Sequence, residues 1–171
     1  MALVPQVVDA VGEKVAVVAA GGLFDGRGLA AALSLGADGV WIGTRFIATP
    51  EAWGVDGYKD VLVATPEDGT VISRAYTGKT CRVVRNEWTN EFEKNPDQLQ
   101  PFPQQAIASM KAGVNHLGYP PGTTVDLNRE FLPAGQGVGA IDAIIPAGEI
   151  VRMLMREATE TLERLTSLRN S

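Results

Sequence analysis

The chain has 171 residues, of which 45% are hydrophobic and 20% charged, and its formal net charge is −5. This length predicts about one domain with enough apolar material for a buried core. The acidic balance argues against a nucleic-acid-binding protein, because phosphate backbones require clustered Lys and Arg. No window reaches the roughly 18 uninterrupted apolar residues of a membrane helix, and the N-terminus lacks the pattern of a signal peptide. We therefore expect a cytoplasmic protein that binds neither nucleic acid nor membrane.

The N-terminal quarter predicts alternating helices and strands. Pro5–Val11 is typical of a short helix, and Val15–Ala20 is a continuous apolar run rich in β-branched residues, which favours a strand. Arg27–Leu35 predicts a helix that stops near Gly36. Gly39–Gly43 then predicts a second apolar strand. Uninterrupted apolar strands indicate a parallel sheet that is covered on both faces, so this stretch is interpreted as a βαβ unit.

Both predicted strands end in glycine. Gly21-Gly22 follows the first strand, and Gly43-Thr44 follows the second. Parallel α/β folds bind ligands at the carboxyl ends of their strands, and glycine lets backbone N–H groups approach an anion closely. A single Gly-Gly pair would indicate only a tight turn, but two such strand ends in sequence favour a phosphate site.

Two further glycine patterns are given less weight. Gly26-Arg27-Gly28 is interpreted as a turn at the start of the helix. Gly135–Gly139 resembles part of a dinucleotide fingerprint, but no apolar strand precedes it. We interpret it as a flexible entry to the next helix that lies close to a ligand.

The middle of the chain predicts a mixture of short elements. Thr49-Pro50-Glu51 has the pattern of a helix start, with an N-cap, a proline and an acid. Tyr58–Ala64 predicts a helix. Thr70–Tyr76 and Thr80–Arg85 predict extended segments around Thr77-Gly78.

The rest of the chain predicts long connections and two helices. Trp88–Pro103 is interpreted as a connection with short helix, and Asn115–Pro133 as a long loop of the kind that often carries function. Gln104–Ala112 predicts a helix. Ala147–Leu168 predicts an amphipathic terminal helix, with Met153 and Met155 as core-filling residues.

A long segment carries a family resemblance. Val17–Ala52 reads VVAAGGLFDGRGLAAALSLGADGVWIGTRFIATPEA and resembles the FMN-binding segment of nitronate monooxygenases, formerly called 2-nitropropane dioxygenases. The resemblance continues more loosely through most of the chain, at Tyr76–Lys79, Arg85–Trp88, Pro101–Pro103 and Gly135-Gln136.

The resemblance implies an α/β fold, the C-terminal part of an FMN-binding TIM-type (β/α)8 barrel with a mostly helical, loop-rich C-terminal region. Val15–Ala20 and Gly39–Gly43 would be barrel strands seven and eight. Residues 1–52 would then be the end of the barrel. Residues 53–133 would lie near the substrate pocket, and residues 134–171 would form C-terminal helices.

The same resemblance implies a cofactor site. The FMN phosphate would be held by Gly22 after strand seven and by Ile42, Gly43 and Thr44 after strand eight, with Gly21 as a neighbour. We expect no metal site. Within the pocket-wall region, Tyr119 or Trp88 would face the substrate, with packing in the core as the alternative.

The family's catalytic histidine belongs to the barrel strands that come before strand seven, so we expect no catalytic residue in this chain. The one histidine, His116, does not match that position and is interpreted as structural. The one cysteine, Cys81, is interpreted as a packed strand residue, although its flanking Lys and Arg residues would favour a reactive thiolate. Arg82 and Arg85 would either meet an anion or be solvated.

The implied function is a flavin-dependent oxidoreductase that oxidises alkyl nitronates with O2 to a carbonyl compound and nitrite. The alternatives are a related FMN-dependent NADH:quinone or enoyl-ACP reductase, and a non-catalytic fragment. Because two strands cannot close a barrel, we also expect the chain to associate with a complementary barrel half or to form a homo-oligomer.

Overall fold

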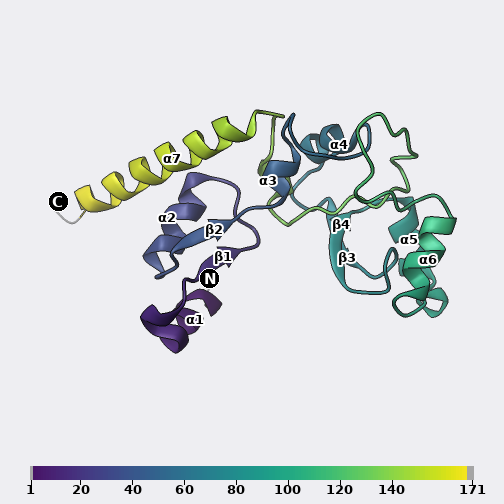
Figure 1. The fold of residues 1–171 in the computed structure, drawn as a ribbon, viewed down its shortest axis with the longest axis horizontal. Helices are drawn as coiled ribbons and strands as arrows, with labels where there is room; N and C mark the ends of the chain where they lie inside the picture. Colours follow the sequence, from purple (N-terminus) through teal and green to yellow (C-terminus); the bar gives the residue numbers. More distant parts are fainter. Residues whose placement is uncertain (1, 169–171) are drawn as a thin grey trace.

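The computed structural model describes residues 2–168, apart from the Glu13 side chain. Its N-terminal part contains α1 (Leu3–Val11), a 3-10 helix (Gly12–Lys14), β1 (Val18–Ala20), α2 (Gly26–Ser34) and β2 (Gly39–Trp41). In Figure 1 this part lies beside the long terminal helix α7 (Ala147–Leu168), apart from the remaining elements. Among residues 2–168, no helix is both long enough and apolar enough to span a bilayer.

β1 and β2 form a parallel pair, as the βαβ interpretation requires. Ala19 pairs with Val40 and Ala20 with Trp41, so the two strands end at the same edge. Asp38 supports the pair, because its carboxylate accepts the Val17 N–H at 2.7 Å and its own N–H donates to the Val17 carbonyl at 2.7 Å.

The expectation of a strand buried on both faces is wrong for the described residues. Only three residues of the predicted Val15–Ala20 run are strand. Val18 is 51% exposed and Trp41 is 74% exposed, whereas Ala19 is buried against α2. The physical reason is that a two-stranded sheet with a helix on one face has nothing to cover its other face or its edges.

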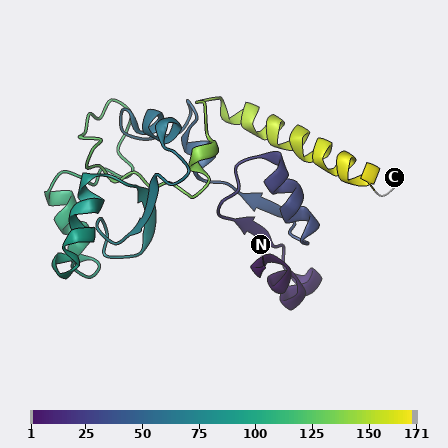
Figure 2. The ribbon, with the colours of Figure 1, turned by 180° about the vertical axis from the view of Figure 1, so that it is seen from behind.

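α2 begins at Gly26 because Asp25 caps it, accepting the Gly28 N–H at 2.9 Å. The Gly26–Gly28 triplet is therefore the first turn of the helix and not a separate turn. α7 packs along α2 (Figure 2). Ala30 and Ala158 are buried together at this contact. Gly26 allows this contact, since a Cβ there would lie 2.3 Å from the Glu157 Cβ.

α7 has the predicted bounds, but its apolar face is only partly covered. Ile150 and Leu154 are buried, whereas Leu165 is exposed. The core-filling interpretation is wrong for Met155, which is 58% exposed, and Met153 is half-buried.

The remaining elements form a second packed group, which lies on the other side of the molecule in Figure 1. It contains α4 (Tyr58–Ala64), β3 (Thr70–Ser73), β4 (Cys81–Val84), α5 (Glu87–Lys94), a 3-10 helix (Pro96–Gln98), α6 (Gln104–Lys111) and a 3-10 helix (Val138–Ala140). β3 and β4 are antiparallel, with Thr70 opposite Val84. The predicted helices and extended segments of this region are thus confirmed, and residues 115–133 run largely as loop.

The short helix expected in the connection after Arg85 is confirmed, and the helix start predicted at Thr49 is wrong. The connection after Arg85 begins with the eight-residue helix α5, because Asn86 and Thr89 form a capping box: the Asn86 side chain accepts the Thr89 N–H and the Thr89 hydroxyl accepts the Asn86 N–H. Thr49 caps no helix. It lies in a turn after the short helix α3 (Thr44–Ile47), and Glu51 accepts the N–H of Ala147 at the start of α7 instead.

Candidate functional site

The carboxyl ends of β1 and β2 open on a cavity of about 230 Å³, here called the strand-end cavity. Gly21 and Gly22 line it from the end of β1, and Gly43 and Thr44 line it after β2. The parallel register brings these two glycine turns side by side, as the sequence predicted. The structure therefore assembles four of the five residues predicted to hold a phosphate around one cavity.

Ile42 is the exception among the predicted residues. It does not line the strand-end cavity, and it contributes instead to an apolar groove between α2, β2 and α7. Successive residues of a strand point to opposite faces, so Ile42 and its neighbours cannot all present side chains to one cavity.

The glycines of the site differ in what surrounds them. Gly21 and Gly22 have φ angles of +93° and +71°, a conformation in which a side chain is strained. An added Cβ would meet no protein atom within 4 Å at Gly21 or at Gly43, whereas at Gly22 it would lie 2.6 Å from the Gln136 amide nitrogen. Gly21 and Gly43 thus border open space where a ligand can approach the backbone, and Gly22 makes room for Gln136.

The glycine-rich loop 135–137 closes one side of this cavity. Gly135 and Gly137 line it, and the Gly135 N–H donates to the Thr44 hydroxyl at 2.8 Å. A Cβ at Gly137 would lie 2.7 Å from the Phe24 ring. The sequence predicts that these glycines lie near a ligand and do not form a dinucleotide fingerprint, and the structure places Gly135 and Gly137 on the wall of the cavity.

Arg45 also lines the strand-end cavity, and it is only 4% exposed. Its Nη2 donates to the Ala143 carbonyl at 2.7 Å, while its Nε has no hydrogen-bond partner among residues 2–168. Burial lowers the pKa of the guanidinium, and the nearby Asp142 carboxylate partly opposes this effect. Although Arg45 belongs to the quoted GTRF segment, the sequence alone offered no reason to single it out.

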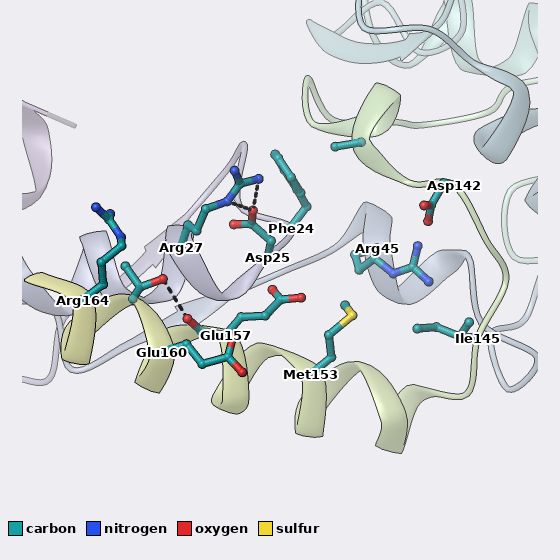
Figure 3. A pocket seen from close by; sticks show the side chains of 12 residues that line it. Phe24, Asp25, Arg27, Arg45, Asp142, Ile145, Met153, Glu157, Glu160 and Arg164 are labelled. Atoms are coloured by element: carbon teal, nitrogen blue, oxygen red, sulfur yellow. Dashed lines mark hydrogen bonds and ion pairs between the residues drawn. The ribbon is translucent and has the colours of Figure 1, made fainter.

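A second cavity of about 550 Å³, here called the α7 cavity, lies beside the first and shares Phe24 and Arg45 with it. Figure 3 shows Arg45 extending from α3 toward the segment that carries Asp142 and Ile145, with Glu157 and Glu160 on α7. Asp25 and Arg27, which also line this cavity, form an ion pair at 2.5 Å.

The N-terminus of α2 is already occupied by the chain's own carboxylates. Asp25 accepts the Gly28 N–H at 2.9 Å, and Glu157 accepts the Gly26 N–H at 2.8 Å. An anionic ligand would meet two negative charges there. The open anion-binding features therefore lie at the strand ends and not at this helix.

His116 lies away from the site, as a structural residue should. Its backbone N–H donates to one oxygen of the Glu130 carboxylate at 2.7 Å, and its ring Nδ1 lies 2.7 Å from the other. Glu130 is fully buried. The pair joins the two ends of a loop segment in the second packed group.

The other singled-out residues also have structural partners. Trp88 is buried and donates to the Ala75 carbonyl at 3.0 Å, whereas Tyr119 is exposed and packs edge-on against His116. Cys81 packs against the cluster around Tyr76, and burial raises the pKa of its thiol, which supports the packing interpretation.

The two arginines near Cys81 are paired within the protein. Arg82 donates to the Thr70 hydroxyl at 3.1 Å, and Arg85 contacts the Glu93 carboxylate at 2.7 Å. Neither lines the strand-end cavity.

Curated proteins with similar sequences span more than this chain does. "Putative monooxygenase Rv1533" from Mycobacterium tuberculosis is 38% identical over 98% of this chain and 45% of its own length. "Probable nitronate monooxygenase" from Staphylococcus saprophyticus is 40% identical over 61% of this chain and 29% of its own length. The chain therefore spans less than half the length of these relatives.

Solved structures of similar fold are also about twice as long as this chain. FabK from Thermotoga maritima matches with a TM-score of 0.78 and 33% identity, over 97% of this chain and 50% of that one. Nitroalkane oxidase from Streptomyces ansochromogenes matches with a TM-score of 0.74 and 31% identity, over 96% of this chain and 44% of that one. The family model described as Nitronate monooxygenase matches residues 1–157. The chain therefore belongs to the nitronate monooxygenase family.

Proposed function

We propose that this chain supplies the phosphate-binding end of an FMN-dependent oxidoreductase that oxidises alkyl nitronates with O2 to a carbonyl compound and nitrite. The observation that carries this proposal is the strand-end cavity, where two glycine turns of parallel strands lie side by side. Membership of the nitronate monooxygenase family supports the reaction class. The bound flavin would supply the redox chemistry, and the protein would bind and orient it.

The residues around the cavity fit a phosphate group. Gly21 and Gly43 border open space, so phosphate oxygens can come close to their backbone. The Thr44 hydroxyl oxygen already accepts the Gly135 N–H, which leaves its proton free to donate to an oxygen of the ligand. The main chain of Ile42 and the Gly22 turn complete the proposed binding set.

We propose that β1 and β2 correspond to strands seven and eight of a TIM-type barrel, with residues 1–52 as the end of that barrel. Both strands lie at an edge in the described structure, which suits a sheet that continues on a complementary barrel half. Residues 53–133 would lie near the substrate pocket, and residues 134–171 would be the C-terminal helical region. We assign no catalytic residue to this chain, because His116 is held by Glu130 away from the strand ends.

A related FMN-dependent reductase, acting on a quinone or an enoyl-ACP with NADH, is the second candidate. The chain resembles FabK and nitroalkane oxidase to a similar degree, and it matches about half of each of those proteins. This similarity to both proteins supports the reductase as a second candidate. Both candidates require the same phosphate site, so the substrate assay must separate them.

The phosphate site is tested most sharply at Gly43. Its φ is −95°, and an added Cβ meets no protein atom within 4 Å, so Gly43→Val should leave the free energy of unfolding nearly unchanged. A phosphate bound at this turn would collide with the valine, so FMN affinity should fall at least about tenfold, as expected for a lost charge-assisted contact.

Gly39→Val is the matched control, because Gly39 begins β2 and its added Cβ also meets open space. Flavin fluorescence titration measures the affinity, and urea denaturation measures the stability. Equal FMN affinity in the Gly43 and Gly39 variants would show that the phosphate does not bind at this turn.

The reaction is tested in a chimera in which this chain replaces the matching part of the Mycobacterium tuberculosis relative. Nitrite release from propyl nitronate, dependent on O2, is expected. NADH oxidation without nitrite release would favour the reductase. Nitrite production by the isolated 171-residue chain would overturn the assignment of the catalytic residues outside it.

A further inference from the structure

Arg45 is a buried cation that forms no ion pair with any of residues 2–168. It is 4% exposed, and its Nε has no hydrogen-bond partner among residues 2–168. Within the described part of the chain its guanidinium makes one hydrogen bond, to a neutral group, the Ala143 carbonyl, at 2.7 Å. No carboxylate of the described residues lies within 4.0 Å of it as an ion pair. A buried charge is normally both paired and hydrogen-bonded, so this arrangement is electrostatically incomplete.

Three acidic side chains around the α7 cavity do not pair with it. Asp142 acts on Arg45 only through its field. Asp25 forms an ion pair with Arg27 and accepts the Gly28 N–H. Glu157 accepts the Gly26 N–H. In Figure 3 these carboxylates lie around the α7 cavity, while the Arg45 guanidinium lies between Asp142 and Ile145.

The position of Arg45 points to the missing anion. It follows Thr44 directly and contributes to the lining of the strand-end cavity, together with Gly21 and Gly43. We infer that Arg45 is the counter-charge of the phosphate group proposed to bind at these strand ends, and that its side chain turns on binding so that the enclosed, unpaired Nε–H donates to a phosphate oxygen. This inference rests on the proposed FMN site and adds a residue that determines specificity for a phosphorylated flavin.

A dianionic phosphate would give Arg45 both an ion-pair partner and a hydrogen-bond acceptor. It places negative charge beside a desolvated guanidinium, and it offers an acceptor to the orphan donor. The backbone N–H groups of the glycine turns bind phosphate through partial charges, so without Arg45 the site would hold two negative charges with no full positive charge among its proposed contacts. We therefore expect the site to bind a phosphomonoester and to prefer FMN over riboflavin.

The test compares FMN with riboflavin, which lacks only the phosphate. In the wild-type 171-residue chain FMN should bind at least about tenfold more tightly, and Arg45→Met should remove most of that preference while leaving riboflavin affinity unchanged. A merely structural role would weaken both flavins equally. Arg45→Lys keeps the charge and should retain part of the preference. Arg27→Met removes the same charge from an exposed position and should leave the ratio as in the wild type.

A second measurement uses the wild-type chain, so it does not depend on a variant that folds. The Arg45 Nε–H resonance, observed by nitrogen-15 NMR, should move downfield and exchange more slowly on addition of FMN, but not of riboflavin. If FMN preference persists in Arg45→Met, or if FMN binds without affecting this resonance, the inference is wrong and the phosphate site stands. If the wild-type chain does not prefer FMN to riboflavin, the phosphate site itself fails, and the inference fails with it.

Discussion

The side-chain oxygen of Thr44 accepts a hydrogen bond from the backbone N–H of Gly135 at 2.8 Å, across 91 positions of sequence. This bond joins the end of β2 to the glycine-rich loop 135–137. Because it uses an acceptor lone pair of the hydroxyl, the Thr44 proton remains available for a ligand. Thr44 therefore closes the strand-end cavity and offers it a donor at the same time.

Thr44→Val keeps the shape of the side chain and removes the hydroxyl. We expect the free energy of unfolding to fall by about 1–3 kcal/mol, because the partly buried Gly135 N–H loses its acceptor. FMN affinity should fall by about tenfold as well. Thr44→Ser retains the hydroxyl and should resemble the wild type in both respects. Urea denaturation and flavin titration measure the two effects, and equal stability of the Val and Ser variants would show that the Gly135 bond contributes nothing.

Gly26→Ala tests the contact between α2 and α7. The added methyl would lie 2.3 Å from the Glu157 Cβ and 2.5 Å from the Ala158 nitrogen, so the helices must separate. Overpacking of this kind costs about 1–3 kcal/mol of unfolding free energy. Gly148→Ala is the control within α7, where the nearest atom is the end of the Arg152 side chain at 3.6 Å. It should be neutral or stabilise by up to about 1 kcal/mol through helix propensity, and thermal denaturation distinguishes the two variants.

Glu130→Ala tests the structural assignment of His116. The buried carboxylate accepts the His116 N–H at 2.7 Å and contacts its ring Nδ1, so its loss leaves the partly buried His116 N–H and ring nitrogen without this partner. We expect a loss of about 2–3 kcal/mol in unfolding free energy, with a smaller loss for Glu130→Gln, which retains an acceptor. FMN affinity should be unchanged in Glu130→Gln. A selective loss of flavin binding at wild-type stability would instead connect this pair to the cofactor site.

Because Tyr58 is buried, the free energy of unfolding should fall as the pH rises in the alkaline range. Its hydroxyl donates to the Pro133 carbonyl, and burial raises the pKa of the phenol above its ordinary value. Above about pH 10 the unfolded chain releases this proton while the folded chain keeps it, so stability must fall as the pH rises. The slope approaches about 1.4 kcal/mol per pH unit for one such group. Tyr58→Phe should be less stable at neutral pH but should lose less stability between pH 9 and pH 11 than the wild type, measured by urea denaturation at each pH. An unchanged slope would show that Tyr58 titrates normally.

Local sequence determined most of the secondary structure of this chain. Tyr58–Ala64 and Ala147–Leu168 have the predicted bounds, because their apolar spacing is helical and strong. The sequence also predicts that β1 and β2 end at glycines, because strands are bounded by residues that permit tight turns. The helix start predicted at Thr49 is wrong because a side-chain hydrogen bond decides the outcome there: the Thr49 hydroxyl accepts the Ala52 N–H within a turn.

Tertiary structure alone decided how the site is assembled. Nothing in the order of residues places Gly135 beside Thr44, or leaves the Nε of Arg45 without a partner in a buried position. Those relationships depend on distant segments packing together, and burial and pairing of charge exist only in the packed state. The sequence determined which residues end the two strands and which family the segment resembles. The packed structure decided that Ile42 lies apart from the strand-end cavity, and that a buried arginine lies on its wall.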